Sequence, residues 1–333
     1  MYSLPELDVV RAFDAIGVLT SGGDAPAMNA AVRAVARTAL NRGIRVYGVH
    51  RGYSGLLSGD LRRMSSASVS NIIQRGGTIL KSDRCEAFYQ AETRQKAADI
   101  LREHGVQALI TIGGDGTLTG AHLFTRETGI PVVGLPGSID NDIPGTDDSI
   151  GFDTAVNTAI GAIDRIRDTA LSHERLFLVE VMGRNSGYIA TQVGIACGAE
   201  MILIPEYPTP VESIGYTLAD NRRTGKGSSG IIVVAEGPEP GLTGRLAEQL
   251  RIFGEEARVC ILGHIQRGGS PSAHDRVLAS CMGVTAVDYL LAGYSDIMVG
   301  CDGRALKPVS LAHVSGGRKR PPQLYQIALQ LHK

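Results

Sequence analysis

Short apolar runs alternate with helical patterns along most of the chain. The runs lie at residues 15–19, 46–49, 108–112, 131–135, 176–181, 201–204, 231–235 and 259–262. Continuous Val, Ile and Leu runs are typical of strands buried on both faces, whereas strands with one wet face alternate apolar and polar residues. Helical patterns separate the runs, as at residues 28–42. This alternation predicts mostly parallel sheets in a doubly wound, Rossmann-like α/β architecture.

The length of the chain favours more than one domain. At 333 residues, it fits two domains of roughly 150 residues each. Residues 145–151 follow one turn and precede a long helical pattern, so we place a hinge there. We expect a first domain at residues 1–150, to which the chain returns at about 266–316. The second domain is expected at residues 151–265 together with 317–333.

Composition excludes several classes of protein. The formal net charge is −1 and no basic stripe is present, which argues against a nucleic-acid partner. No apolar run approaches the roughly 18 residues of a membrane span, and the first residues lack the features of a signal peptide. The five cysteines are widely spaced without a C-x-x-C pair, as is typical of reduced thiols. We therefore expect a cytoplasmic protein that does not bind membranes.

Five of the predicted strands lead directly into glycine-rich or charged turns. These turns lie at residues 20–24, 113–117, 136–142, 182–184 and 263–269. In open parallel sheets, ligands bind at the carboxyl ends of strands. We therefore expect all five turns to face one crevice, with the active site in the cleft between the two domains.

Two of the turns contain a Gly-Gly pair followed by Asp. The glycines would let the backbone approach a phosphate and point amide groups at it, and the next helix would add its positive end. Asp115 lies inside the second turn. It suits Mg²⁺, which on phosphates usually takes one or two carboxylates, although a helix N-cap is the alternative.

Asp140 and Asp142 follow an apolar strand and flank Asn141. In an extended segment, side chains two residues apart point the same way. Two carboxylates held close raise one pKa, which suits a general base, and a solvated acidic turn is the alternative. Arginines near turns or strand ends could bind phosphate groups in bidentate fashion, although spacing alone singles out none of them.

Familiar nucleotide-binding patterns do not fit this sequence. Residues 225–230 match G-x-G-x-x-G, but they precede a strand instead of following one. A Walker P-loop is also missing from the sequence. A nucleotide would therefore be bound in another way.

Five blocks together resemble the bacterial ATP-dependent 6-phosphofructokinases. They are residues 17–26 (GVLTSGGDAP), 113–116 (GGDG), 136–142 (PGSIDND), 179–184 (VEVMGR) and 263–271 (GHIQRGGSP). The match runs in order from about residue 15 to residue 295. It implies a glycolytic kinase that transfers the γ-phosphoryl group of MgATP to the 1-hydroxyl of fructose 6-phosphate. A kinase for another ketose phosphate and a non-catalytic nucleotide-sensing subunit are the alternatives.

The resemblance assigns roles to individual residues. It makes Asp140 the base and Asp115 the Mg²⁺-linked carboxylate, with Asp142 near it. Arg184 would stabilise the transferring phosphoryl group, and Arg84 would lie between the two reactants. The implied ATP contacts are Gly23, Arg84, Cys85, Gly113, Gly114, Asp115, Gly116, Thr117 and Gly120. The implied contacts to the sugar phosphate are Ser138, Asp140, Asp142, Arg175, Met182, Gly183, Arg184, Glu236, Arg258, His264 and Arg267.

The resemblance also bears on assembly and on the phosphoryl donor. Residues that match Arg175 and Arg258 reach the substrate from a neighbouring subunit, which implies a homo-oligomer, typically a tetramer. Pyrophosphate-using relatives carry Asp where this chain has Gly116 and Lys where it has Gly137. Both positions favour ATP here.

The family's effector site is only partly conserved in this chain. Its matching residues are Arg33, Arg37 and Arg167. Ser66 and Asn71 replace an expected Arg and Asp, and residues 225–229 keep only Lys226 of a more basic stretch. Ala27 replaces a usual Gly, which we expect to cost little.

We predict weakened or altered regulation by ADP and phosphoenolpyruvate, because fewer basic groups remain to bind their phosphates. Initial rates at subsaturating fructose 6-phosphate, with and without ADP, measure this. Strong activation by ADP would contradict the prediction.

Overall fold

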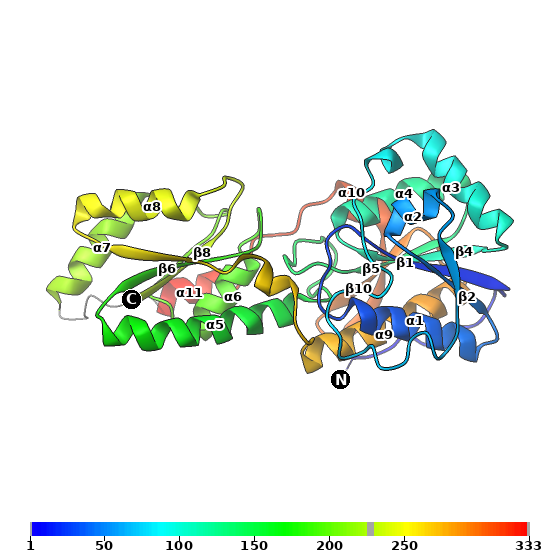
Figure 1. Cartoon of the computed structure of the whole chain (residues 1–333), viewed down its shortest axis with the longest axis horizontal. Coiled ribbons are helices and arrows are strands. Elements are labelled where there is room, and N and C mark those ends of the chain that lie inside the picture. The colour runs from blue at the N-terminus through cyan, green and yellow to red at the C-terminus, as the bar shows by residue number, and fades with distance from the viewer. Residues whose placement is uncertain (1, 225–229, 332–333) are drawn as a thin grey trace. The chain divides into compact units, whose positions relative to one another are not determined.

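The computed structural model describes residues 2–224 and 230–331, which fall into two compact units. Unit 1 comprises Met1–Thr154 and Arg267–Lys319, and unit 2 comprises Ala155–Gln266 and Arg320–Lys333. These bounds differ by a few residues from those expected from the sequence. Residues 225–229, which belong to the expected effector site, lie outside the described residues. Each unit is an α/β domain built on its own sheet (Figure 1).

Unit 1 contains a seven-stranded sheet in the order β11-β10-β5-β4-β1-β2-β3. The bounds are β1 Ala15–Ser21, β2 Arg45–Val49, β3 Leu61–Met64, β4 Ala108–Gly113, β5 Val132–Pro136, β10 Ile297–Asp302 and β11 Ala305–Ser310. The two edge strands, β3 and β11, are antiparallel to their neighbours and the inner strands are parallel. β1, β4 and β5 are buried along their whole length, as their continuous apolar runs predicted. The mixed α/β architecture with mostly parallel strands is therefore confirmed.

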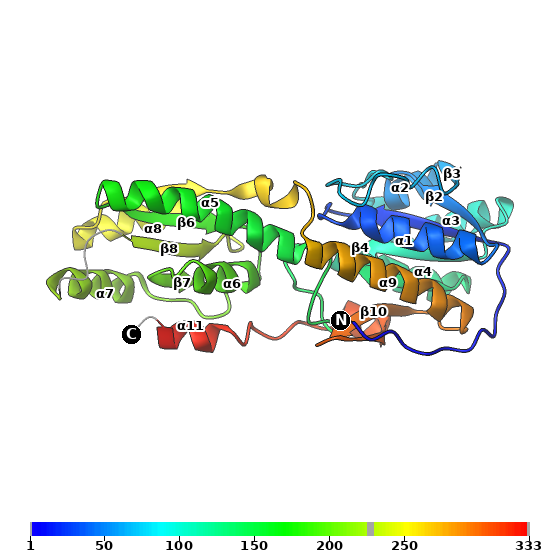
Figure 2. The same ribbon diagram turned by 90° about the horizontal axis from the view of Figure 1, so that it is seen from below.

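Helices cover both faces of this sheet. They are α1 Met28–Asn41, α2 Gly52–Leu57, α3 Ala91–Glu103, α4 Asp115–Thr128, α9 Ala273–Leu291 and α10 Leu311–Gly316, with the 3₁₀ helix η1 Glu86–Tyr89. α1 and α9 pack side by side on one face (Figure 2). A Cβ atom at Gly283 of α9 would lie 2.6 Å from the Cβ of Ala34, so this close packing requires glycine.

Unit 2 contains a parallel four-stranded sheet in the order β7-β8-β6-β9. The bounds are β6 Leu176–Val181, β7 Met201–Leu203, β8 Gly230–Ala235 and β9 Ala257–Ile261. The helices are α5 Phe152–Ser172, α6 Tyr188–Ala196, α7 Val211–Arg223, α8 Leu242–Leu250 and α11 Tyr325–Leu331, with η2 Arg251–Phe253 and η3 Gly263–Arg267. Apolar side chains of α7 and α8 form one core with β6 and β8.

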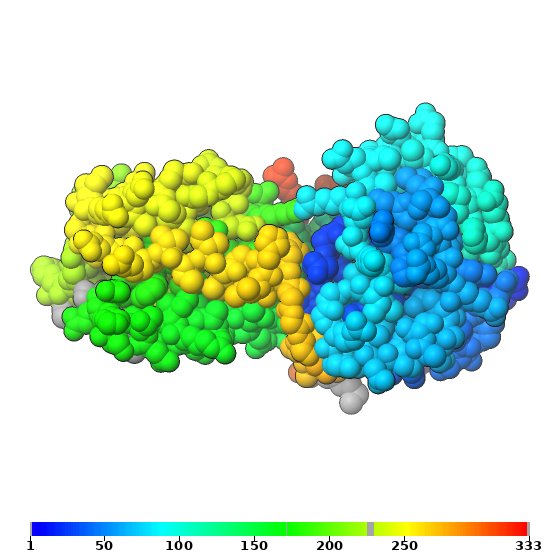
Figure 3. All heavy atoms as spheres, in the orientation of Figure 1, coloured from blue at the N-terminus to red at the C-terminus, as the bar shows by residue number. Residues whose placement is uncertain are grey.

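Strand β9 departs from the expectation of burial on both faces. Val259 is 39% exposed and Ile261 is 60% exposed, because β9 is the edge strand of its sheet. Figure 3 shows this part of the chain at the surface of unit 2 (orange-yellow). An apolar run alone cannot distinguish such an edge strand from an inner strand.

The expected hinge at residues 145–151 is fixed within unit 1. The division between the units falls at Thr154 and Ala155, inside helix α5. Asp275 of α9 is fully buried, and its carboxylate accepts hydrogen bonds from the Gly151 amide at 2.9 Å and from the amide and hydroxyl of Thr154. A side chain of α9 therefore caps the amino end of α5.

No helix among residues 2–224 and 230–331 is long and apolar enough to cross a membrane.

We predict that Asp275→Ala destabilises unit 1 strongly. It leaves three buried donors without an acceptor, each worth about 1–3 kcal/mol. Asp275→Asn keeps one acceptor oxygen and should therefore lower the free energy of unfolding less than Asp275→Ala does. Urea denaturation measures both, with Asp164→Ala as the control, an exposed position on α5, the helix that Asp275 caps.

The same carboxyl group should make stability depend on pH. Burial raises the pKa of Asp275 to about 6, above its value in the unfolded chain. The folded state therefore holds a proton that the unfolded state has lost, so the contribution of Asp275 to stability is greatest below about pH 4 and falls as pH rises to about 6. The Asp275→Asn protein should lack this component, and an identical pH profile in both proteins would contradict the assignment.

Candidate functional site

Three of the polar turns meet at the carboxyl edge of the unit 1 sheet. They follow β1, β4 and β5, which are neighbours in the order β5-β4-β1. The amide of Gly137 donates to the carbonyl of Gly113 at 2.9 Å, and the hydroxyl of Thr117 donates to the carbonyl of Ser21 at 3.0 Å. The strand order and these bonds hold the three turns together.

The glycines of these turns differ in backbone conformation and in the space that a side chain would have. A Cβ atom at Gly113 would lie 2.5 Å from the carbonyl oxygen of Ser21, so the backbones of two turns touch there. Gly22 has a φ of +81°, a left-handed conformation that side chains disfavour. Gly114 is the N-cap of α4, and a Cβ atom at Gly116 would meet no atom within 4 Å. The amino end of α4 is thus open to an anion.

Asp115 is the first residue of α4 and carries an unusual carboxyl group. Partial burial, together with the charge of Asp142, raises its pKa. The turns after β4 and β5 therefore bring two carboxylates close enough to repel each other. A divalent cation would relieve this repulsion, so the two groups fit Mg²⁺.

No group of three or more His, Cys, Asp or Glu residues is arranged to hold a metal within the described part of the chain. This absence is compatible with Mg²⁺, because Mg²⁺ on phosphates takes one or two carboxylates and fills its other positions with water and phosphate oxygens. Asp115 and Asp142 are therefore the candidate ligands.

The segment that carries Asp140 and Asp142 is a turn, and the extended conformation expected for it is wrong. Asn141 has a φ of +48°, in the left-handed region that Asn tolerates better than most residues. The hydroxyl of Ser138 contacts both aspartates. Its oxygen accepts a hydrogen bond from the Asp140 amide, and it donates one to the Asp142 carboxylate, each at 3.2 Å. Asp140 is 5% exposed. A local hydrogen-bond network, and not strand geometry, holds the Asp140 backbone and the Asp142 carboxylate in place.

A second loop packs against the turn after β1 and brings Arg84 to it. The amide of Gly22 donates to the carbonyl of Asp83 at 3.1 Å, and the hydroxyl of Ser82 donates to the Gly22 carbonyl. Arg84 is exposed beside this contact. The sequence patterns gave no sign of this loop contact, because hydrogen bonds between distant loops leave no periodic signal.

Arg267 and Gly120 each have a packing role at this edge. The Arg267 guanidinium donates to the carbonyl of Asp24 at 3.2 Å and lies 3.1 Å from where a Cβ of Gly23 would be. At Gly120, a Cβ would lie 3.1 Å from Tyr53, so glycine lets that ring pack close to α4. Cys85, Tyr53 and Phe88 belong to the same apolar cluster.

The carboxyl edge of the unit 2 sheet gathers a second set of predicted residues. Met182, Gly183 and Arg184 follow β6, Glu236 follows β8 and His264 follows β9. Arg184 has a φ of +51°, and its amide donates to the Glu236 carboxylate at 2.8 Å. Gly183 has a φ of +148°, and a Cβ there would lie 2.3 Å from the Ser186 carbonyl oxygen. This tight turn presents the exposed Arg184 side chain at the end of β6.

Arg175 and Arg258 lie at the other edge of that sheet. Arg175 precedes β6, and Arg258 pairs with Phe177 near the amino ends of β6 and β9. A strand of this length separates the two edges by about 20 Å. Within one chain, these two arginines therefore do not join Arg184 and Glu236.

The expected effector residues fall on two different units. Arg33 and Arg37 lie one turn apart on α1, and the buried Nε of Arg37 has no hydrogen-bond partner within residues 2–224 and 230–331. Arg167 lies on α5, and its guanidinium donates to the carbonyls of Cys197 and Gly198 at the end of α6. The structure thus gives Arg167 a local role in unit 2.

Ala27, the residue in place of a usual glycine, is the N-cap of α1. Its φ is +69°, in the left-handed region, and it is fully buried. A residue with a Cβ atom, unless it is Asn or Asp, is destabilised by about 1–2 kcal/mol in this conformation, because the Cβ comes too close to the following carbonyl oxygen. The expected small cost did not take this backbone conformation into account.

Comparisons with known proteins agree on one family. The phosphofructokinase family model matches residues 15–290. An ATP-dependent 6-phosphofructokinase of Thermus thermophilus is 55% identical over 289 residues, which cover 86% of this chain and 88% of that protein. One from Bacteroides thetaiotaomicron is 52% identical over 291 residues, with the same two coverages. A phosphofructokinase structure from Saccharomyces cerevisiae superposes with a TM-score of 0.85 at 36% identity, covering 96% of this chain and 46% of the yeast chain.

The family match spans the three turns of unit 1 and the three strand ends of unit 2 on which the candidate residues lie. The identity to each of the two bacterial relatives extends over most of both chains. The chain therefore belongs to the phosphofructokinase family.

Proposed function

We propose that this protein is an ATP-dependent 6-phosphofructokinase. It transfers the γ-phosphoryl group of MgATP to the 1-hydroxyl of fructose 6-phosphate and releases fructose 1,6-bisphosphate and ADP. The observation that carries the proposal is the carboxyl edge of the unit 1 sheet. There the buried Asp140, the Asp115–Asp142 pair and the open amino end of α4 lie on turns that are bonded to one another. The names of the bacterial relatives support the same activity.

Asp140 is the proposed general base. Its carboxylate takes the proton from the sugar 1-hydroxyl as the oxygen attacks the γ-phosphorus. The hydroxyl oxygen of Ser138 accepts from the Asp140 amide, which holds the backbone that carries the carboxylate. Asp115 and Asp142 would hold Mg²⁺, which when bound neutralises charge on the transferring phosphates. Catalysis is then mostly positioning and electrostatic stabilisation.

The arginines complete the proposed mechanism. Arg184, presented by its left-handed turn, stabilises the charge of the transferring group, and Arg84 contacts the nucleotide phosphates. Met182, Glu236 and His264 contact the sugar phosphate. We assign this substrate to unit 2 and the nucleotide to unit 1.

The position of Arg175 and Arg258, together with the phosphate-binding role that the resemblance implies for them, supports a homo-oligomer. They lie at the amino edge of the unit 2 sheet, one strand length away from Arg184. They can contact a sugar phosphate bound at the carboxyl edge only when that substrate belongs to a neighbouring subunit. We therefore propose an assembly in which each site is completed by a second chain, and the resemblance makes this assembly a tetramer.

We predict that Asp140→Ser lowers kcat at least about 10²-fold, because the general base is lost. The Mg²⁺ concentration for half-maximal rate should stay unchanged in this variant. Asp142→Asn is the matched comparison, and it should raise that Mg²⁺ concentration because a ligand charge is removed. Both are measured by initial rates over a Mg²⁺ series. Full activity in folded Asp140→Ser protein would remove Asp140 from the mechanism.

We predict turnover with MgATP and none with pyrophosphate. A Cβ atom at Gly116 has open space around it, whereas one at Gly137 would lie 3.1 Å from the Cε of Met28. Space thus exists for nucleotide phosphates at Gly116, and a larger residue at 137 would disturb the core. Parallel initial-rate assays with the two donors measure this, and equal rates would contradict the assignment of ATP.

Gly116→Asp tests the same point within one protein. The added carboxylate should repel the nucleotide phosphates and lower kcat/KM for ATP at least about tenfold. It should leave thermal stability unchanged or slightly higher, because an acidic residue in the first turn of α4 interacts favourably with the helix dipole. Gly116→Ala is the control for size alone. Unchanged kcat/KM for ATP in Gly116→Asp would place the phosphates elsewhere.

A further inference from the structure

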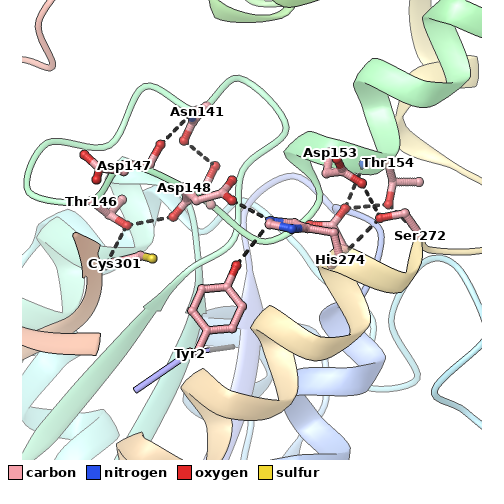
Figure 4. Close-up of polar contacts among 12 residues, drawn as sticks. Tyr2, Asn141, Thr146, Asp147, Asp148, Asp153, Thr154, Ser272, His274 and Cys301 are labelled. Carbon is pink, nitrogen blue, oxygen red and sulfur yellow. Dashed lines mark hydrogen bonds and ion pairs between the residues drawn. The ribbon is translucent and has the colours of Figure 1, made fainter. Parts of the chain in front are cut away.

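Behind the turn that carries Asp140 lies an ion pair to which the proposed mechanism assigns no role. The Nε2 atom of His274, in the first turn of α9, lies 2.5 Å from a carboxylate oxygen of Asp148 (Figure 4). The hydroxyl of Tyr2 approaches the same nitrogen at 3.3 Å, and the two rings meet edge to face. The pair therefore links three segments of unit 1 that are distant in sequence.

Asp148 belongs to a loop that folds back on the residues around Asp140. The Asn141 side-chain amide donates to the carbonyl of Asp147 at 2.9 Å. The hydroxyl of Ser149 lies 3.1 Å from the Asn141 side-chain oxygen and 2.6 Å from the Ser138 carbonyl oxygen. The neighbours of Asp148 on both sides thus hold the residues that flank Asp140. A shift of Asp148 would be transmitted to the general base through these short contacts.

The other side of the loop is attached to the strand pair β10–β11. The Cys301 amide donates to the Thr146 hydroxyl at 2.9 Å, and the Asp147 amide donates to the Cys301 carbonyl at 2.7 Å. The Gly303 amide donates to the Asp147 carboxylate at 2.7 Å. Figure 4 shows the contact between Thr146 and Cys301 on one side of the loop and His274 on the other. The loop is thus clamped from two directions, and the second clamp is an ion pair.

We propose that His274 is a positioning residue, which holds Asp148 and thereby fixes the loop that orients Asp140 for proton abstraction. This inference rests on the proposed function. His274 touches no substrate in this scheme and acts through the loop. Asp148 is its partner in the same role.

The ion pair has a defined pH range. Hydrogen bonding to Asp148 raises the pKa of His274 to about 8, against the opposing effect of burial. The other ionisable groups that face the pair are Tyr2 from the amino-terminal segment, Asp153 of α5, Asp275 of α9, and Lys319, which faces Asp148. Burial raises the pKa of Tyr2, so its hydroxyl stays neutral. The charged pair is therefore complete below about pH 6.5 and is lost as pH rises through about 8.

Asp148→Asn tests the proposal in the full-length enzyme. At about pH 7 we expect kcat to fall about tenfold, less than the roughly 10²-fold that a 1 Å misplacement can cost, with the KM for ATP unchanged. The ratio of parent to variant kcat should shrink toward one above about pH 9, where His274 is neutral in both proteins. A purely structural role would lower stability without this pH-dependent ratio.

His274→Lys and His122→Gln complete the set. Lysine keeps its charge to about pH 10, so His274→Lys should retain kcat near the parent value and move the alkaline decline upward. His122 forms a comparable ion pair with Asp296, 2.8 Å apart, elsewhere in unit 1. His122→Gln should leave the kcat profile unchanged. A parent-to-Asp148→Asn ratio that is constant with pH would overturn the proposal.

Amide hydrogen exchange separates this inference from the proposed reaction. Free parent enzyme and Asp148→Asn are compared over residues 139–148, without substrate, at about pH 7. Faster exchange in the variant supports the clamp even if fructose 6-phosphate proves to be the wrong acceptor. Equal exchange in both proteins overturns the clamp, whatever the substrate is.

Discussion

The active region depends on the close approach of three backbone turns at the carboxyl ends of β1, β4 and β5. At Gly113 this approach leaves no room for a side chain, because a Cβ atom would lie 2.5 Å from a carbonyl oxygen of the neighbouring turn. The same closeness aligns the amino end of α4 with the turn that carries Asp140. Backbone amides and carboxylates therefore share one edge of one sheet, which is the arrangement that phosphoryl transfer requires.

Sequence patterns predicted the inner strands of both sheets apart from β10, because burial on both faces leaves continuous apolar runs; the buried strand β10 was missed. They failed where the environment of a strand depends on its neighbours. β9 has the composition of an inner strand but lies at an edge, with Ile261 exposed. β3 is short and largely polar, and its pairing with β2 cannot be read from its four residues.

The roles of the candidate site residues stay a prediction, and the structure shows that the turns carrying several of them meet at one edge of the unit 1 sheet. Asp115, Asp140 and Asp142 follow strands and could be found from that position alone. The left-handed Asn141 and the double role of Ser138 could not, because they arise from hydrogen bonds within one turn. Resemblance suggested Arg175 and Arg258 as phosphate-binding residues, and the strand register places them at the opposite edge of the unit 2 sheet from Arg184.

The strand order of unit 1 also has a consequence for the synthesis of the chain. β10 pairs with β5, yet about 160 residues, including all the strands of unit 2, separate them in sequence. As the chain leaves the ribosome, the apolar edge of β5 stays unpaired until β10 has been synthesised. The strands of unit 2, in contrast, emerge in one continuous segment. An unpaired apolar edge is a site of aggregation, so nascent unit 1 needs protection until its last strands emerge. A truncated product that ends before β10 would therefore keep the candidate catalytic residues of unit 1 and still be prone to aggregate.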